Sequence, residues 1–157
     1  MDMLRKIELG LVLLFLFINI YFLLSNPSIS GFFLYGSEEV NAPHDFINEE
    51  NIIVDSDRII LQIENYTLSK YSLSKSMVPV FDSGANGVGI KPTSEDDLHV
   101  GDIITFRQGK NLVVHRIIEK GIDEEGIYFI TKGDNNDIND GKIRFSQIDS
   151  VLVALIY

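Results

Sequence analysis

A serine, a histidine and a group of aspartates are the side chains of this chain that could carry out nucleophilic hydrolysis. Ser76 opens the motif Ser76-Met77-Val78-Pro79, in which the proline keeps the chain extended and could display the serine rigidly at a strand end. A serine hydroxyl is a weak nucleophile until a base takes its proton, so Ser76 would need a partner. The motif alone is a weak signal, because most such serines belong to ordinary turns.

His115 is the candidate partner, since histidine has the side chain whose proton affinity suits a general base near neutral pH. It lies in the apolar run Leu112–Ile118, where strand alternation places it on the same face as Val113 and Ile117. A lone histidine in such a place is more often a core residue, hydrogen-bonded to backbone, than a catalyst. The other two histidines, His44 and His99, lie in polar segments typical of the surface.

The acidic segment Lys132–Asp140 could supply a third group, because it carries the carboxylates of Asp134, Asp137 and Asp140. One of them could orient and stabilise a histidine imidazolium, as the aspartate of a serine triad does. The same composition is also typical of plain loops. Calcium remains a minor alternative, since the segment lacks the loop glycine and closing glutamate of an EF-hand.

These residues lie among short segments of strand-forming residues. Several such segments are bounded by turn formers, and no helix is predicted after residue 24: Ile59–Ile63, Tyr66–Ser72, Ile103–Phe106, Leu112–Ile118, Ile127–Thr131 and Val151–Tyr157. The last is too short to span a membrane and predicts a buried closing strand. The pattern therefore predicts an all-β domain over residues 58–157.

Composition excludes several classes of function. The chain has 157 residues, a formal charge of −10 and no cysteine, so disulfides, cysteine nucleophiles and cysteine metal sites are absent. The charges of residues 1–24 cancel, which leaves the whole negative charge on residues 25–157. An acidic domain repels phosphate backbones, and nucleic acid is therefore not an expected partner.

An apolar stretch precedes the β-rich part. Residues 7–24 would form a helix of about 27 Å, close to the roughly 30 Å of a bilayer core. Arg5 and Lys6 predict that residues 1–6 are cytosolic and that the domain lies outside the membrane. A cleavable signal is the alternative, but Leu24–Pro27 lacks a small-x-small site, so we favour an uncleaved anchor. Residues 25–57 read as a stem or linker, in which the apolar residues 29–35 would form an interfacial segment or a strand along the membrane surface.

Four motifs in order resemble those of the type I signal peptidases, specifically the archaeal and endoplasmic-reticulum branch, in which histidine stands in place of the bacterial lysine. The motifs are Ser76-Met77, Gly101–Phe106, Val114-His115-Arg116 and Lys132-Gly133-Asp134-Asn135. The resemblance covers roughly Ser74–Asp140, together with the N-terminal anchor. Each motif is weak alone, and their order makes the match specific.

The resemblance implies a signal-peptidase-like β-fold and a role for each matching residue. Ser76 would be the nucleophile, His115 the general base, Asp140 the partner of His115, and Asp134 a support of the loop. The backbone N–H of Ser76 and the hydroxyl of Ser74 would stabilise the oxyanion. Proximity to Ser76 suggests three substrate-binding side chains: Leu73, Met77 and Val78. The resemblance implies no metal and no other cofactor.

By this resemblance the chain would be a membrane-anchored serine endopeptidase that removes signal peptides from secretory preproteins. Its expected partners are those preproteins and membrane lipid, and the sequence leaves open whether accessory subunits are needed. The membrane could be an archaeal cell membrane or an internal eukaryotic one. In either case the catalytic domain would be extracytoplasmic.

Two alternatives compete with this interpretation. A self-cleaving repressor-type Ser-Lys protease would need a lysine in place of His115 and a DNA-binding domain in front, and neither is present. A non-catalytic, membrane-tethered β-domain that binds a partner protein would keep Gly101-Asp102 and lose the reactive side chains. Because Ser76, His115 and both aspartates are all present, we favour the peptidase.

Overall fold

The computed structural model describes residues 5, 12–19, 21 and 40–157. Contacts divide the chain into two units, Met1–Glu39 and Val40–Tyr157. In the first unit residues 12–19 are helical, and the Asn19 amide donates to the carbonyl of Phe15 at 2.7 Å, which satisfies this polar side chain within its own helix. No helix among the described residues is long and apolar enough to cross a membrane. Much of the expected anchor at 7–24, and all of the apolar segment at 29–35, lie outside the described residues.

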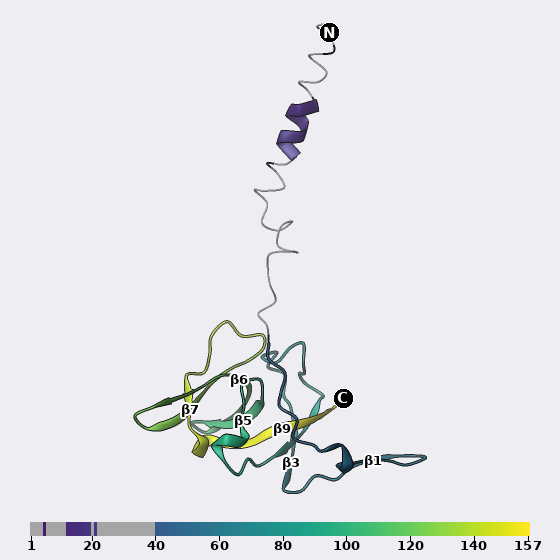
Figure 1. The fold of residues 1–157 in the computed structure, drawn as a ribbon, viewed down its shortest axis with the longest axis vertical. Coiled ribbons are helices and arrows are strands. Elements are labelled where there is room, and N and C mark those ends of the chain that lie inside the picture. Colours follow the sequence, from purple (N-terminus) through teal and green to yellow (C-terminus); the bar gives the residue numbers. More distant parts are fainter. Residues whose placement is uncertain (1–4, 6–11, 20, 22–39) are drawn as a thin grey trace. The chain divides into compact units, whose positions relative to one another are not determined.

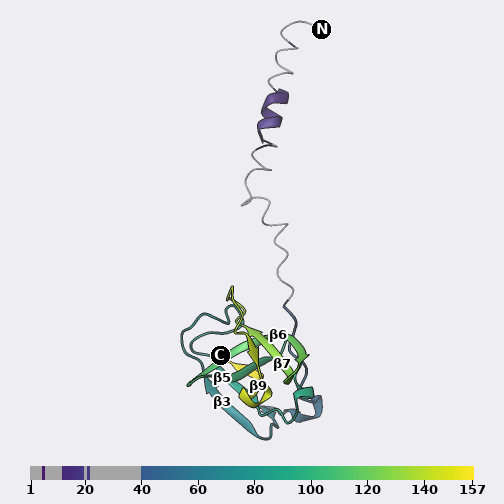
Figure 2. The same cartoon turned by 90° about the vertical axis from the view of Figure 1, so that its left-hand side faces the viewer.

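The second unit is built on a seven-stranded antiparallel sheet, which confirms the prediction of an all-β domain. Its strands are β3 (Tyr66–Lys70), β4 (Asn86–Ile90), β5 (Ile103–Gln108), β6 (Asn111–Asp123), β7 (Gly126–Lys132), β8 (Lys142–Ile143) and β9 (Ile148–Ile156). They lie in the order β3-β4-β9-β5-β6-β7-β8. The sheet is strongly curved, as the two views in Figure 1 and Figure 2 show. Three short 3₁₀ helices, η1 (Glu49–Asn51), η2 (Glu95–Asp97) and η3 (Phe145–Gln147), complete the unit.

The β5–β6 hairpin turns between Gln108 and Asn111, and its register pairs Ile104 with His115. The predicted closing strand forms part of β9, which lies in the interior of the sheet between β4 and β5. Strand β4 was not predicted, because Gly87 and Gly89 interrupt its apolar pattern. The structure gives the reason: a Cβ on Gly87 would overlap the Tyr71 hydroxyl, so a residue without a side chain is needed where Tyr71 crosses this strand.

Both faces of the sheet are covered by apolar side chains. Successive residues of β5 point to opposite faces, and Ile103 and Ile104 accordingly belong to two separate clusters. One cluster contains Leu98, Ile104, Phe106, Ile117, Phe129, Ile143, Ile148 and Val151. The other contains Met77, Phe81, Ala85 and Ile103. The residue directly after Ser76 is thus part of a buried core.

Residues 40–57, which we expected to belong to a stem or linker, are in contact with the β-domain at their beginning. The N–H of His44 donates to Asp102 Oδ1 at 2.6 Å, and Arg116 Nη1 donates to the carbonyl of Asn41 at 3.2 Å. Further along, β1 (Ile52–Val54) and β2 (Ile59–Leu61) form a separate hairpin of exposed apolar residues that extends away from the large sheet (Figure 1). The division into cytosolic end, anchor, stem and domain stays a prediction.

Candidate active site

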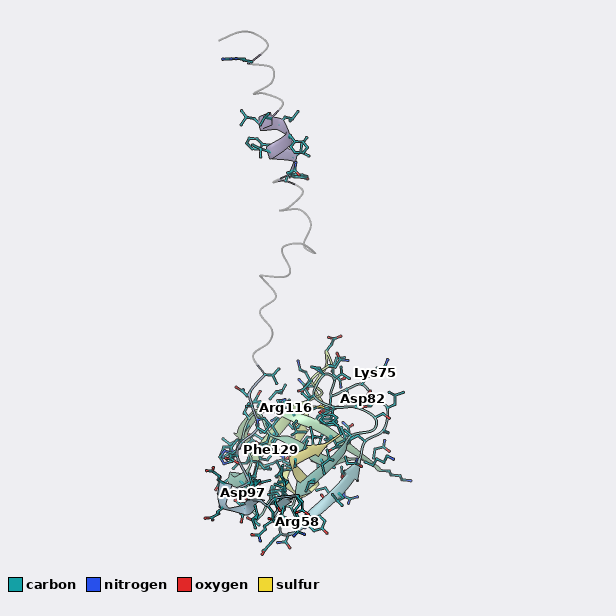
Figure 3. All side chains as sticks on the ribbon, turned by 90° about the vertical axis from the view of Figure 1, so that its right-hand side faces the viewer. Arg58, Lys75, Asp82, Asp97, Arg116 and Phe129 are labelled. Carbon is teal, nitrogen blue, oxygen red and sulfur yellow. The ribbon has the colours of Figure 1, made fainter. Side chains whose placement is uncertain are left out.

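Ser76 lies in the loop between β3 and β4, and a carboxylate holds the backbone just before it. Asp82 Oδ1 accepts the N–H groups of Ser74 at 3.2 Å and Lys75 at 3.1 Å. These hydrogen bonds, above all that from Lys75, hold the pKa of Asp82 below its ordinary value. Lys75 has a positive φ of 62°, and Met77 on the other side is buried. Figure 3 shows Lys75 and Asp82 together at one end of the domain. The serine is therefore held on a constrained turn.

The two serines expected to form the oxyanion site are in contact. Ser74 Oγ lies 3.1 Å from Ser76 Oγ, and it also accepts the backbone N–H of Ser76 at 3.3 Å. The Ser74 hydroxyl and the Ser76 N–H thus lie beside the proposed nucleophile. Both are donors of the kind that can stabilise a negatively charged oxygen next to Ser76 Oγ.

His115 lies on β6 and is largely buried, with 7% of its surface exposed. Its Nδ1 is 2.7 Å from Asp140 Oδ2, and the same carboxylate oxygen accepts the hydroxyl of Thr131 at 2.8 Å. The Asp140 N–H also donates to the Thr131 carbonyl at 2.8 Å, so β7 fixes both the backbone and the side chain of this aspartate. A histidine whose Nδ1 donates to a carboxylate keeps Nε2 as its basic nitrogen.

Asp134 has a different partner from Asp140. Its two oxygens accept from Arg116 Nε at 2.8 Å and Nη2 at 2.7 Å, and both side chains are 6% exposed. Arg116 Nη1 also donates to the carbonyl of Gly101 at 2.8 Å. Figure 3 shows Arg116 within the domain. This fork-to-fork pair fastens the beginning of the acidic loop to β6, one residue after His115.

The acidic loop is also attached to Ser76. Asn135 donates its backbone N–H to the Ser76 carbonyl at 2.9 Å, and its side-chain amide donates to the Lys75 carbonyl at 3.1 Å. A Cβ on Gly133 would lie 2.7 Å from the Ser76 carbonyl oxygen, so only glycine permits this approach. Hydrogen bonds therefore connect the segments that carry the serine and the two aspartates.

One cavity of about 590 Å³ brings the reactive side chains together. Ser76 and His115 both line it, with Ser74 and Asn136 beside them. Its walls come from residues 69–72 and 112–114, and Tyr71, Met77 and Phe81 contribute apolar surface. Among the described residues no hydrogen bond joins Ser76 to His115; in uncomplexed enzymes such bonds commonly tighten only with substrate bound.

The three suggested substrate-binding residues differ in position. Met77 lines the cavity, whereas Leu73 and Val78 are exposed and lie outside its lining. Two aromatic residues also line the cavity: the rings of Tyr71 and Phe81 pack together, with their centroids 4.3 Å apart. Burial raises the pKa of Tyr71 to about 12, so its hydroxyl stays neutral.

Several site residues were not assigned from the sequence: Tyr71, Phe81, Arg116, Thr131 and Asn136. A charge inside the apolar run of β6 was a usable signal for Arg116, since a charged residue in a buried strand needs a partner. Thr131 and Tyr71 gave no such signal, because both are ordinary strand residues. Their roles depend on which loop folds over them.

The described residues contain no group of three or more histidine, aspartate or glutamate side chains that could hold a metal ion. In the acidic segment, Asp134 and Asp140 are used by Arg116 and His115. The side chains that the cavity and its hydrogen bonds bring together, a serine, a histidine and a carboxylate, can act as nucleophile, base and orienting group.

No model of a known protein family matches the chain. Curated relatives do. Signal peptidase I W of Bacillus subtilis (strain 168) is 43% identical over 72 residues, which is 45% of this chain and 37% of that protein. The signal peptidase complex catalytic subunit SEC11C of Homo sapiens is 38% identical over 71 residues, covering 43% of this chain and 36% of the relative.

The catalytic subunit SEC11 of the yeast Scheffersomyces stipitis is 34% identical over 70 residues, or 43% of this chain and 41% of that protein. The matched part of the chain thus spans well under half the length of each of these curated relatives. The relatives confirm the resemblance that the ordered motifs predicted: over somewhat less than half of its length, the chain is similar to proteins named signal peptidase.

Proposed function

We propose that this protein is a membrane-anchored serine endopeptidase that removes signal peptides from secretory preproteins. The observation that carries the proposal is the 2.7 Å hydrogen bond between His115 and Asp140 in a cavity that Ser76 also lines. A buried histidine with a carboxylate on Nδ1 and a serine in the same cavity are the parts of a hydrolytic triad. The relatives named signal peptidase support the choice of substrate.

In the proposed reaction, His115 Nε2 takes the proton of Ser76 as its oxygen attacks the carbonyl carbon of the scissile bond. Asp140 stabilises the imidazolium that forms and keeps the ring in the productive orientation. The Ser76 N–H and the Ser74 hydroxyl release their mutual hydrogen bond and donate to the oxyanion. His115 then gives its proton to the leaving amine. In the second half of the reaction His115 takes a proton from water as it attacks the acyl-enzyme, and returns that proton to Ser76 Oγ when the ester bond breaks.

Anchoring residues 7–24 in the membrane would complete this function. A signal peptide is itself held in the bilayer, so tethering the peptidase there raises the effective concentration of the two partners. The domain would lie on the extracytoplasmic side, as Arg5 and Lys6 predict. The substrate would lie extended between residues 69–72 and 112–114.

The test is cleavage of a model preprotein by the full-length protein in detergent, beside Ser76→Ala and the matched control Ser83→Ala. Ser83 is an exposed serine of the same loop and lies outside the cavity lining. We expect cleavage by the wild type and the control and none by Ser76→Ala. Equal cleavage by wild type and Ser76→Ala would refute the assigned nucleophile. No cleavage by folded wild type would favour a domain that only binds a partner.

A further inference from the structure

Asn136 lines the cavity beside Ser76 and His115, yet the reaction described above does not use it. Its backbone is fixed, since its N–H donates to the Gly133 carbonyl at 2.9 Å. Its half-buried side chain packs closely against Gly133. The cavity is therefore lined here by an amide on a rigid turn.

The Asn136 amide has no hydrogen-bond partner among the described residues, in contrast to the neighbouring Asn135. None of the buried polar side-chain atoms in the described part of the chain lacks a partner, so the Asn136 amide is accessible to solvent. An ordered, accessible amide offers a donor and an acceptor together. This is the combination that can bind one peptide unit of an extended chain.

The direction of the cavity indicates which part of a substrate Asn136 would meet. The walls at 69–72 and 112–114 come from the segments before Ser76 and His115 respectively, and on β6 the lining ends at His115. Asn136 comes from the acidic loop, which is fastened to the Ser76 carbonyl through Asn135. A peptide strand held between the walls would therefore meet the acidic loop, with Asn136, next to the scissile bond.

We propose that Asn136 binds the substrate backbone on the leaving-group side of the scissile bond. Its amide donates to a carbonyl of the departing segment and so holds the leaving nitrogen in reach of His115. A contact to the backbone accepts any side chain there, which suits a peptidase whose products differ in sequence. Such a contact raises the rate because the orientation of the scissile bond is already fixed on binding and no longer adds to the barrier. This inference rests on the proposed endopeptidase function and adds a substrate-binding residue to it.

The experiment compares two substrates with the same acyl segment. One continues for several residues past the scissile bond, and the other ends in an aryl amide that has no peptide backbone on the leaving side. We expect Asn136→Ala to lower kcat/KM about tenfold for the extended peptide, the loss of one hydrogen bond, and to leave the aryl amide nearly unchanged. Asn136→Asp, which keeps the shape and loses the donor, should behave like Asn136→Ala. Asp137→Ala, an exposed neighbour outside the cavity lining, is the matched control.

The ratio of the two rates within one variant does not depend on how much of the protein is folded. Equal losses on both substrates would mean that Asn136 only supports the loop, and would overturn the inference. An unchanged rate on the extended peptide would overturn it as well. If the wild type cleaved neither substrate, the proposed function itself would fall, and this inference with it.

Discussion

His115 and Arg116 are neighbours on β6, and each holds one aspartate of the same loop. His115 binds Asp140 and Arg116 binds Asp134, both at 2.7 Å. Because consecutive strand residues point to opposite faces, β6 holds the acidic loop at two separate points. The position of the Asp140 carboxylate is thus tied to a buried ion pair that takes no part in the proposed chemistry.

Breaking that ion pair should destabilise the fold. Asp134→Ala leaves the buried guanidinium of Arg116 without its partner, and we expect a loss of about 3–5 kcal/mol in the free energy of unfolding. Urea unfolding followed by circular dichroism measures it. The matched control is Asp149→Ala, which breaks the more exposed pair with Arg107 and should cost less than about 1 kcal/mol. Similar losses in both variants would contradict a special role for Arg116 and Asp134.

Asp140 should matter for activity much more than its neighbour Asp137. Asp140→Ala removes the carboxylate that orients His115 and stabilises its charged form, so we expect kcat to fall roughly a thousandfold or more. Asp137→Ala removes an exposed carboxylate from the same loop and should change kcat little. Steady-state cleavage of a peptide substrate by both variants decides between them. The opposite order would show that the wrong carboxylate was assigned to the histidine.

The carboxylate of Asp82 should control the serine loop rather than global stability. Asp82→Ala removes the acceptor of the Ser74 and Lys75 N–H groups, and we expect kcat/KM to fall about tenfold because the Ser76 turn loosens. Asp82→Asn retains an acceptor oxygen and should lose less. Peptide cleavage and thermal unfolding are measured in parallel, with Ser83→Ala as the control. A large drop in melting temperature with no selective loss of activity would point to a different role.

Acid should weaken a surface cluster far from the cavity. Hydrogen bonds from Lys142, and then Arg144, lower the pKa of Asp123 from 3.8 to about 2. A carboxylate whose pKa is lowered by folding stabilises the protein above its unfolded pKa, and this contribution is lost as the pH falls through the folded value. Between about pH 4 and pH 2, wild type should therefore lose more stability than Asp123→Asn. Urea unfolding at several pH values tests this, and parallel curves would contradict it.

Residue pattern was enough to predict the β-domain, because the strands from Ile103 to Thr131 are apolar, β-branched and separated by recognisable turns. It failed at β4, where Gly87 removes the apolar signal so that Tyr71 can cross. The residue pattern also could not predict the partner of Arg116, because nothing local in the sequence shows that Asp134, eighteen positions later, folds back onto β6. Motif order identified Ser76 and His115, which line one cavity, and Asp140, which is hydrogen-bonded to His115. The lining around them depends on packing between distant loops.

The hydrogen bonds from Asn135 to Lys75 and Ser76 have a practical consequence for protein engineering. The two loops that they join are sixty residues apart in the chain, yet neither can be redesigned alone, because lengthening one would displace the other. A chimaera that imported only the acidic loop from a relative would misalign its serine. Loop grafting in this scaffold should therefore exchange both segments from the same donor.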